Sequence, residues 1–246
     1  MHNILLDIVR KKKEDIQKIN DIDSFKTAIV HPKYSDTAFI GEIKLASPTM
    51  KPIDSKMDII KQAIEYENAG LDAISAITEK HFFKGDPLFI PKIKKKIKLP
   101  ILQKDFVIDE SQIYEAKQIG SDALLLIARL VDEQTLIRFV SLCQKLGIEP
   151  VVEIQNDEDL YKAVATNTSI IAVNARNLET FEINVDSACK LIKKIPERFM
   201  KLGFSGIQSS KEVKKYNSSG VKGVLIGTSL MKSKNILKFI HSLKKA

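Results

Sequence analysis

Polar side chains suited to acid–base chemistry follow separate apolar runs of the chain. In chain order they are Glu42, Lys44, Lys104, Glu153, Asn174 and Arg176. Two lysines and two carboxylates at one site would shift each other's pKa values, and general acid–base catalysis requires such shifts. No histidine ends such a run, no cluster has metal-ligand spacing, and neither a P-loop nor a dinucleotide fingerprint is present. The sequence therefore predicts acid–base catalysis with no metal and no cofactor.

Two glycine-containing segments near the end of the chain are candidates for binding phosphate. Ser205-Gly206-Ile207 and Gly227-Thr228-Ser229 each follow an apolar run and combine glycine with a hydroxyl side chain. Glycine lets backbone N–H groups approach an anion closely, although both segments could be no more than tight turns. The paired glycine and hydroxyl residues favour the phosphate interpretation. We therefore expect a small phosphorylated molecule as the substrate.

The apolar runs that carry these residues have the character of buried parallel strands, which read as continuous Val/Ile/Leu segments. Short helical patterns separate them, and glycines 70, 120, 147 and 220 are placed to end helices about three residues before the next run. The pattern and the length of 246 residues predict an α/β fold, a single (β/α)₈ TIM barrel over residues 1–246. The expected strands are Ala38 to Ile43, Ala73 to Ile77, Ile101 to Lys104, Ala123 to Ile127, Glu149 to Glu153, Ile170 to Asn174, Phe199 to Gly203 and Gly223 to Ile226.

Residues 1–37 precede the first expected strand and form an N-terminal helical extension. Apolar residues recur there at roughly helical spacing, namely Leu5, Ile8, Val9, Ile16 and Ile19. An amphipathic helix needs a surface for its apolar face. We expect this one to dock on the bottom or the rim of the barrel, as a plug or a lid.

Composition limits the partners. The net charge of +8 admits an anionic metabolite or a nucleic acid. In the lysine-rich run from Lys92 to Lys98, however, Ile93 and Ile97 are spaced as on an amphipathic helix, and no aromatic residue is interleaved for base stacking. We therefore expect a solvated helix face and no nucleic-acid partner. No run could span a membrane, and the two cysteines are expected to be buried, reduced thiols of a cytoplasmic protein.

The order and spacing of these motifs resemble the indole-3-glycerol phosphate synthase family over roughly residues 35 to 245. Each motif alone would be weak, but together and in this order they are highly specific. They are Glu42-Ile-Lys44-Leu-Ala-Ser47-Pro48, Phe83-x-Gly85, Lys104-Asp105-Phe106, Glu149-Pro150-Val-Val-Glu153, Asn174-Ala-Arg176-Asn177-Leu178, Ser205-Gly206-Ile207 and Leu225-Ile226-Gly227-Thr228-Ser229.

The resemblance implies closure of the indole ring of 1-(2-carboxyphenylamino)-1-deoxyribulose 5-phosphate, with loss of CO₂ and water. By the same resemblance Lys104 is the general acid, Glu153 assists dehydration, and Glu42 and Asn174 support that step and hold substrate hydroxyls. Lys44 and Arg176 would face the anthranilate carboxylate. The remaining implied substrate-binding residues are Ser47, Ser205, Gly206, Gly227 and Thr228 for phosphate, Phe83, Phe106 and Leu125 for the aromatic ring, and Leu225. A monomer or a weak homodimer is expected.

The most informative departure from the family pattern follows the seventh expected strand. The family usually has Glu-Ser-Gly-Ile after the seventh strand, whereas Phe204 precedes Ser205 here, which removes a carboxylate. We expect Phe204 just beyond that strand, at a partly solvated position of the barrel mouth. Two alternatives remain open at this point. The chain could be another phosphate-binding barrel enzyme of tryptophan biosynthesis, or a catalytically impaired barrel that binds a ligand such as RNA.

Overall fold

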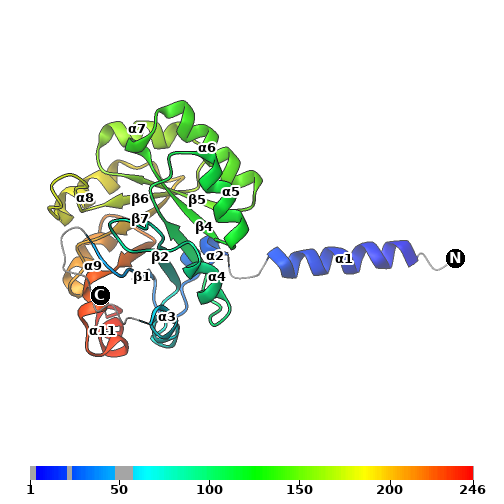
Figure 1. Cartoon of the computed structure of the whole chain (residues 1–246), viewed down its shortest axis with the longest axis horizontal. Helices are drawn as coiled ribbons and strands as arrows, with labels where there is room; N and C mark the ends of the chain where they lie inside the picture. Colours follow the sequence, from blue (N-terminus) through cyan, green and yellow to red (C-terminus); the bar gives the residue numbers. More distant parts are fainter. Residues whose placement is uncertain (1–3, 21–23, 48–57, 246) are drawn as a thin grey trace.

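The computed structural model describes residues 4–20, 24–47 and 58–245. Eight parallel strands close into a barrel in chain order, with β8 paired to β1 (Figure 1). This is the (β/α)₈ TIM barrel predicted from the sequence. The strands are β1 (Ala38–Ile43), β2 (Ala73–Ile77), β3 (Ile101–Lys104), β4 (Ala123–Ile127), β5 (Glu149–Ile154), β6 (Ile170–Asn174), β7 (Met200–Phe204) and β8 (Gly223–Ile226).

Helices surround the barrel and cover its outer surface (Figure 1). The glycines expected to end helices, at positions 70, 120, 147 and 220, all have φ between 71° and 91°, a left-handed conformation that suits glycine. The helices are α1 (Ile4–Asn20), α2 (Phe25–Val30), α3 (Ile59–Asn68), α4 (Phe89–Lys94), α5 (Glu110–Ile119), the 3₁₀ turn η1 (Ala128–Leu130), α6 (Glu133–Lys145), α7 (Asp157–Ala165), α8 (Val185–Lys194), α9 (Ser210–Asn217), α10 (Thr228–Lys232) and α11 (Ile236–Leu243).

Inward-facing side chains fill the barrel in layers. In such barrels each layer takes four side chains from alternate strands. The registers around the barrel place Ile40, Leu102, Val151 and Leu202 in one layer. Two residues further along the same four strands lie Glu42, Lys104, Glu153 and Phe204. We call these four residues the catalytic layer, because three of them carry the predicted chemistry.

Phe204 is not where the sequence placed it. Strand β7 runs one residue further than expected, so Phe204 is its last residue and not the first residue of the loop. Its ring is 1% exposed and packs in the apolar cluster inside the barrel. The alternation along the strand explains this, because Met200 and Leu202 share its inward face. The expectation of a partly solvated position was wrong.

The N-terminal extension forms two helices. The predicted amphipathic helix is present as α1, but it lies away from the barrel, and Ile4, Leu6, Ile8 and Val9 are exposed (Figure 1). The expected docking of this helix is therefore not observed. The shorter helix α2 takes the place at the barrel instead. Its Phe25 and Ile29 are 1% exposed and pack in the cluster of the barrel interior.

Other expectations from composition concern charge, thiols and membranes. Ile93 and Ile97 are buried, and the lysines from Lys92 to Lys98 are exposed, as expected of a solvated helix face. Cys143 and Cys189 are both free thiols; Cys143 is buried, as expected of both, whereas Cys189 is only partly buried. Within the described ranges, no helix combines the length and the apolar character needed to cross a membrane.

Candidate active site

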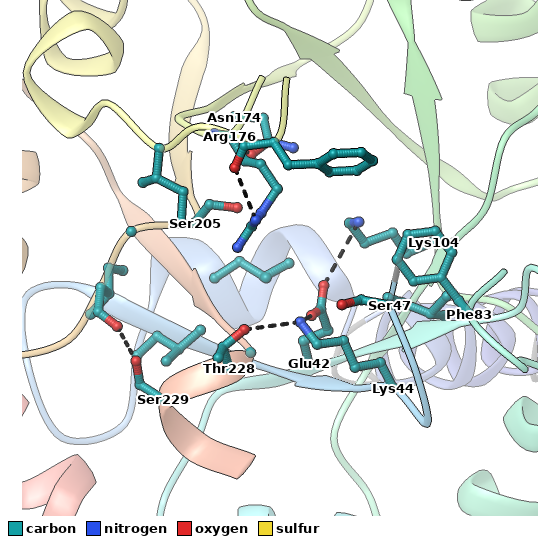
Figure 2. A pocket seen from close by; sticks show the side chains of 18 of the residues that line it. Glu42, Lys44, Ser47, Phe83, Lys104, Asn174, Arg176, Ser205, Thr228 and Ser229 are labelled. Atoms are coloured by element: carbon teal, nitrogen blue, oxygen red, sulfur yellow. Dashed lines mark hydrogen bonds and ion pairs between the residues drawn. The ribbon is translucent and has the colours of Figure 1, made fainter. Parts of the chain in front are cut away.

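A cavity of about 490 Å³ opens at the carboxyl ends of the strands. This is the size of a small-molecule site, at the end of the barrel where such enzymes carry their active sites. Every residue that the sequence predicted for catalysis or substrate binding lines it (Figure 2). These residues are Glu42, Lys44, Ser47, Phe83, Lys104, Phe106, Leu125, Glu153, Asn174, Arg176, Ser205, Gly206, Leu225, Gly227 and Thr228.

Glu42 is the centre of a charge network on one side of the cavity. Its carboxylate is almost fully buried and lies 2.7 Å from Lys44 Nζ and 3.7 Å from Lys104 Nζ. Burial alone would raise the pKa of Glu42, but the positive charges of Lys44, Lys104 and Arg176 and the hydrogen bond from Lys44 outweigh it and hold that pKa below its usual value. Glu42 is therefore an ionised carboxylate at neutral pH.

Glu153 has the opposite environment. It is 1% exposed and accepts a hydrogen bond from Asn174 Nδ2 at 3.1 Å, and its Oε2 has no hydrogen-bond partner among the described residues. Burial raises its pKa, since the attraction of Lys104 and the Asn174 hydrogen bond do not compensate for lost hydration. Two carboxyl groups whose pKa values are pushed apart can divide acid and base roles. Glu153 is suited to donate a proton, and Glu42 to remain charged.

Gly227 sits where strand β8 approaches the Glu42–Lys44 pair. A Cβ at this position would collide with Glu42 Oε1 and lie 3.1 Å from Lys44 Nζ. Lys44 Nζ also donates to Thr228 Oγ1 at 3.3 Å. The glycine therefore brings the backbone of the predicted phosphate loop close to the charged pair, a constraint that the sequence pattern does not show.

The second predicted phosphate loop follows β7. Ser205 has φ 70° and Gly206 has φ 80°, so two consecutive residues adopt the left-handed conformation. Such a conformation is unfavourable for serine and is characteristic of functional loops. A Cβ at Gly206 would also collide with Val185 Cγ2 and lie 3.0 Å from Ile183 Cγ2.

The opposite side of the cavity is apolar. The rings of Phe83 and Phe106 lie 6.2 Å apart with an interplanar angle of 34°, and Leu125 lines the floor. Aromatic rings at this spacing form a surface on which a flat ligand can pack. Arg176 follows β6, and its Nη1 donates to Phe181 O at 3.2 Å.

The sequence did not predict several residues of the lining. Leu178, Phe181 and Ile183 come from the loop after β6, and Lys232 and Phe239 come from the two helices that follow β8. Lys232 follows Thr228 by one helical turn, so the spacing could have predicted that both residues face the site. Nothing in the sequence pattern predicts Phe181 as a lining residue. Its backbone is in the left-handed conformation, with φ 60°.

In the part of the chain that the structure describes, no group of His, Cys, Asp and Glu side chains is arranged to hold a metal ion. What the site offers instead is two ammonium groups, a guanidinium, one carboxyl group with a lowered pKa and one with a raised pKa, and aromatic rings on the wall of the cavity. Such a set suits proton transfer to and from an anionic substrate that carries an aromatic ring.

Comparison with known proteins identifies the family. The family model described as indole-3-glycerol phosphate synthase matches residues 6–243. The chain belongs to this family. Curated relatives of that name include the protein of Caldanaerobacter subterraneus subsp. tengcongensis, which is 39% identical over 93% of each chain. Another, from Clostridium kluyveri, is 38% identical over 96% of this chain and 94% of its own. The family resemblance inferred from the motifs is confirmed, and neither alternative from the sequence gains support.

Solved structures show the same architecture at much lower identity. A 3-hexulose-6-phosphate synthase superposes with a TM-score of 0.68 at 13% identity, over 85% of this chain and 99% of its own. The 3-hexulose-6-phosphate synthase from Salmonella typhimurium gives a TM-score of 0.63 at 15% identity, over 85% of this chain and 97% of its own. At this identity the likeness shows a shared barrel fold.

Proposed function

We propose that Lys104 and Glu153 carry the proton transfers by which this chain makes indole-3-glycerol phosphate. The chain is a carboxy-lyase of tryptophan biosynthesis, as its family and its relatives indicate. The substrate is 1-(2-carboxyphenylamino)-1-deoxyribulose 5-phosphate. The observation that supports these roles best is that two buried carboxyl groups share one layer with Lys104 and have pKa values shifted in opposite directions, lowered at Glu42 and raised at Glu153.

Ring closure joins the aromatic carbon that bears the carboxylate to the keto carbon of the sugar chain. The carbonyl oxygen takes up a proton as this C–C bond forms. Lys104 is the better placed ammonium, because Lys44 is held at 2.7 Å by Glu42 and also donates to Thr228, whereas Lys104 lies 3.7 Å from Glu42. Loss of CO₂ then returns the electron pair to the six-membered ring and restores its aromaticity.

Dehydration completes the indole. The hydroxyl group formed from the ketone leaves as water after it takes a proton from Glu153. The neighbouring CH₂ then loses a proton to the Glu153 carboxylate as the C=C bond forms, which restores the acid. Asn174 holds Glu153 through the 3.1 Å hydrogen bond. The ionised Glu42 and the Asn174 amide support this step and bind the substrate hydroxyls.

The two ends of the substrate fit two sides of the cavity. The phosphate would bind at Ser47 and at the loops of Gly206 and Gly227. The anthranilate ring would pack on Phe83, Phe106 and Leu125, with its carboxylate toward Lys44 and Arg176. In this assignment the keto carbon of the substrate lies between the phosphate site and the ring site, above the catalytic layer.

We also propose how the protein occurs in the cell. One barrel domain with residues 1–37 as an extension would work in the cytoplasm, as a monomer or a weak homodimer, without a nucleic-acid partner. Sedimentation velocity at several protein concentrations, with and without a short RNA, would test the assembly and the nucleic-acid statements together.

The proposed activity is tested by turnover of the synthetic substrate, followed through the fluorescence of the indole product. Wild-type protein should convert it at a rate typical of enzymes, about 1 s⁻¹ or faster. Conversion no faster than that of a Lys104→Ala/Glu153→Ala double variant would refute the proposal.

A further inference from the structure

Two tyrosines behind the active site are buried completely. Tyr66 lies on α3, which follows β1, and Tyr216 lies on α9, which follows β7; both side chains have 0% exposure. Neither tyrosine lines the cavity. Both lie between a helix and the outer surface of the barrel, where a phenylalanine would pack equally well.

A strand glycine makes room for each tyrosine ring. A Cβ at Gly41 would lie 2.6 Å from Tyr66 Cδ2, and a Cβ at Gly203 would lie 2.5 Å from Tyr216 Cδ1. Real side chains do not approach so closely, so each ring occupies the space that a side chain on the strand would need. The same arrangement of glycine and tyrosine therefore occurs in two βα units of the barrel.

The hydroxyl groups reach backbone carbonyls at the ends of the strands. Tyr66 Oη accepts from Gln62 Nε2 at 2.7 Å and donates to Glu42 O at 3.2 Å. Tyr216 Oη lies 3.1 Å from Phe204 O and 3.0 Å from Ser205 O and donates to this pair of carbonyls. Burial raises the pKa of both tyrosines, so both hydroxyls stay protonated and able to donate throughout the working pH range.

These carbonyls belong to different parts of the site. Glu42 carries the ionised carboxylate that pairs with Lys44 and Lys104. Ser205 begins the loop whose left-handed backbone continues through Gly206 to the predicted phosphate site. A displacement of about 1 Å in a group that faces the reacting atoms can change a rate by about a hundredfold. A hydrogen bond at each point would therefore affect a different property of the enzyme.

We propose that Tyr66 and Tyr216 are positioning residues with separate roles, Tyr66 for the catalytic carboxylate of Glu42 and Tyr216 for the phosphate loop at Ser205 and Gly206. The proposal rests on the proposed function for its assay. Each tyrosine acts through the backbone of the residue that it holds and does not touch the substrate.

The test compares Tyr66→Phe with Tyr216→Phe, since both variants keep the ring that packs on the strand glycine. Tyr66→Phe should lower kcat by about fivefold to twentyfold and leave the inhibition constant of inorganic phosphate within about twofold of wild type. Tyr216→Phe should raise the KM and the inhibition constant of phosphate by about fivefold, with kcat within about twofold. Tyr114→Phe, at a half-exposed position of α5, serves as the matched control and should change neither property.

A second pair of variants perturbs the same contacts from the strand side. Gly41→Ala should reproduce the loss of kcat, and Gly203→Ala the weaker phosphate inhibition. Equal effects of Tyr66→Phe and Tyr216→Phe on both parameters would show that the two hydroxyls only support the barrel, and would overturn the proposal. An unchanged kcat in Tyr66→Phe and Gly41→Ala would also overturn it. Inactive wild-type protein would instead refute the proposed function, which separates the two failures.

Discussion

Replacement of Phe204 by glutamate tests the position of this residue in the catalytic layer. The ring is 1% exposed inside the barrel, and burial of a phenylalanine side chain contributes roughly 1.5–3 kcal/mol to the free energy of unfolding. The new carboxyl group would share its layer with Glu42 and Glu153, so it would enter in the neutral form. A buried polar group without a hydrogen-bond partner costs a further ~1–3 kcal/mol.

The sum is a loss of about 2.5–6 kcal/mol for Phe204→Glu. In a domain of this size each kcal/mol shifts the melting temperature by about 2–4 °C, so the expected decrease is roughly 5–24 °C. Phe204→Leu is the matched control, and its smaller loss of about 1–2 kcal/mol should lower the melting temperature by roughly 2–8 °C. Differential scanning calorimetry measures both. A decrease below about 2 °C for Phe204→Glu would refute the burial of this position and restore the solvated mouth expected from the sequence.

Three further predictions concern Glu153 and Gly227. Glu153→Gln should lower kcat by about 10²–10⁴-fold with little change in KM, because the amide keeps the shape but cannot donate the proton; a change confined to KM would make Glu153 a substrate-positioning residue. The raised pKa of Glu153 means that the native state binds its proton more tightly than the unfolded chain does, so this group lowers stability as pH rises from its usual pKa of 4.5 to the raised value. Urea denaturation from pH 4 to 9 should show Glu153→Gln gaining stability relative to wild type as pH rises, and a constant difference would contradict the raised pKa. Gly227→Asp should weaken indole-3-glycerol phosphate by about tenfold or more, since its side chain would displace the Glu42 carboxylate and repel the phosphate; undiminished affinity by titration calorimetry would exclude this loop from the site.

The barrel could be predicted from the sequence because its signals are local and repeated. Six of the eight expected strands have the observed bounds, β5 extends one residue further than expected, and β7 is shifted by one residue at both ends. The strands are largely apolar runs. The glycines at positions 70, 120, 147 and 220 each mark the end of a helix, because each occupies the left-handed backbone conformation that suits glycine. The candidate residues were found for a related reason, since the carboxyl ends of the strands in a closed barrel all meet in one place.

The sequence-based predictions were wrong where a strand boundary depends on a single residue, and where two helices could occupy the same surface of the barrel. Phe204 and Gly203 are both compatible with a strand end, and a shift of one residue decides whether the ring enters the barrel. An amphipathic pattern indicates an apolar face but does not identify its partner, so α1 was expected at the barrel where Phe25 and Ile29 of α2 pack instead. Neither the pKa division between Glu42 and Glu153 nor the close approach of Gly227 to Glu42 is visible before the strands are brought together.

The most direct test of the account is the kcat of Lys104→Ala on 1-(2-carboxyphenylamino)-1-deoxyribulose 5-phosphate, measured by indole fluorescence beside the affinity of the variant for indole-3-glycerol phosphate. Lys104 is the only residue to which the mechanism assigns the proton for ring closure. The account predicts a kcat lower by about 10²–10⁴-fold with an affinity for the product close to that of wild type. A kcat within about threefold of wild type would remove Lys104 from the mechanism and contradict the central claim.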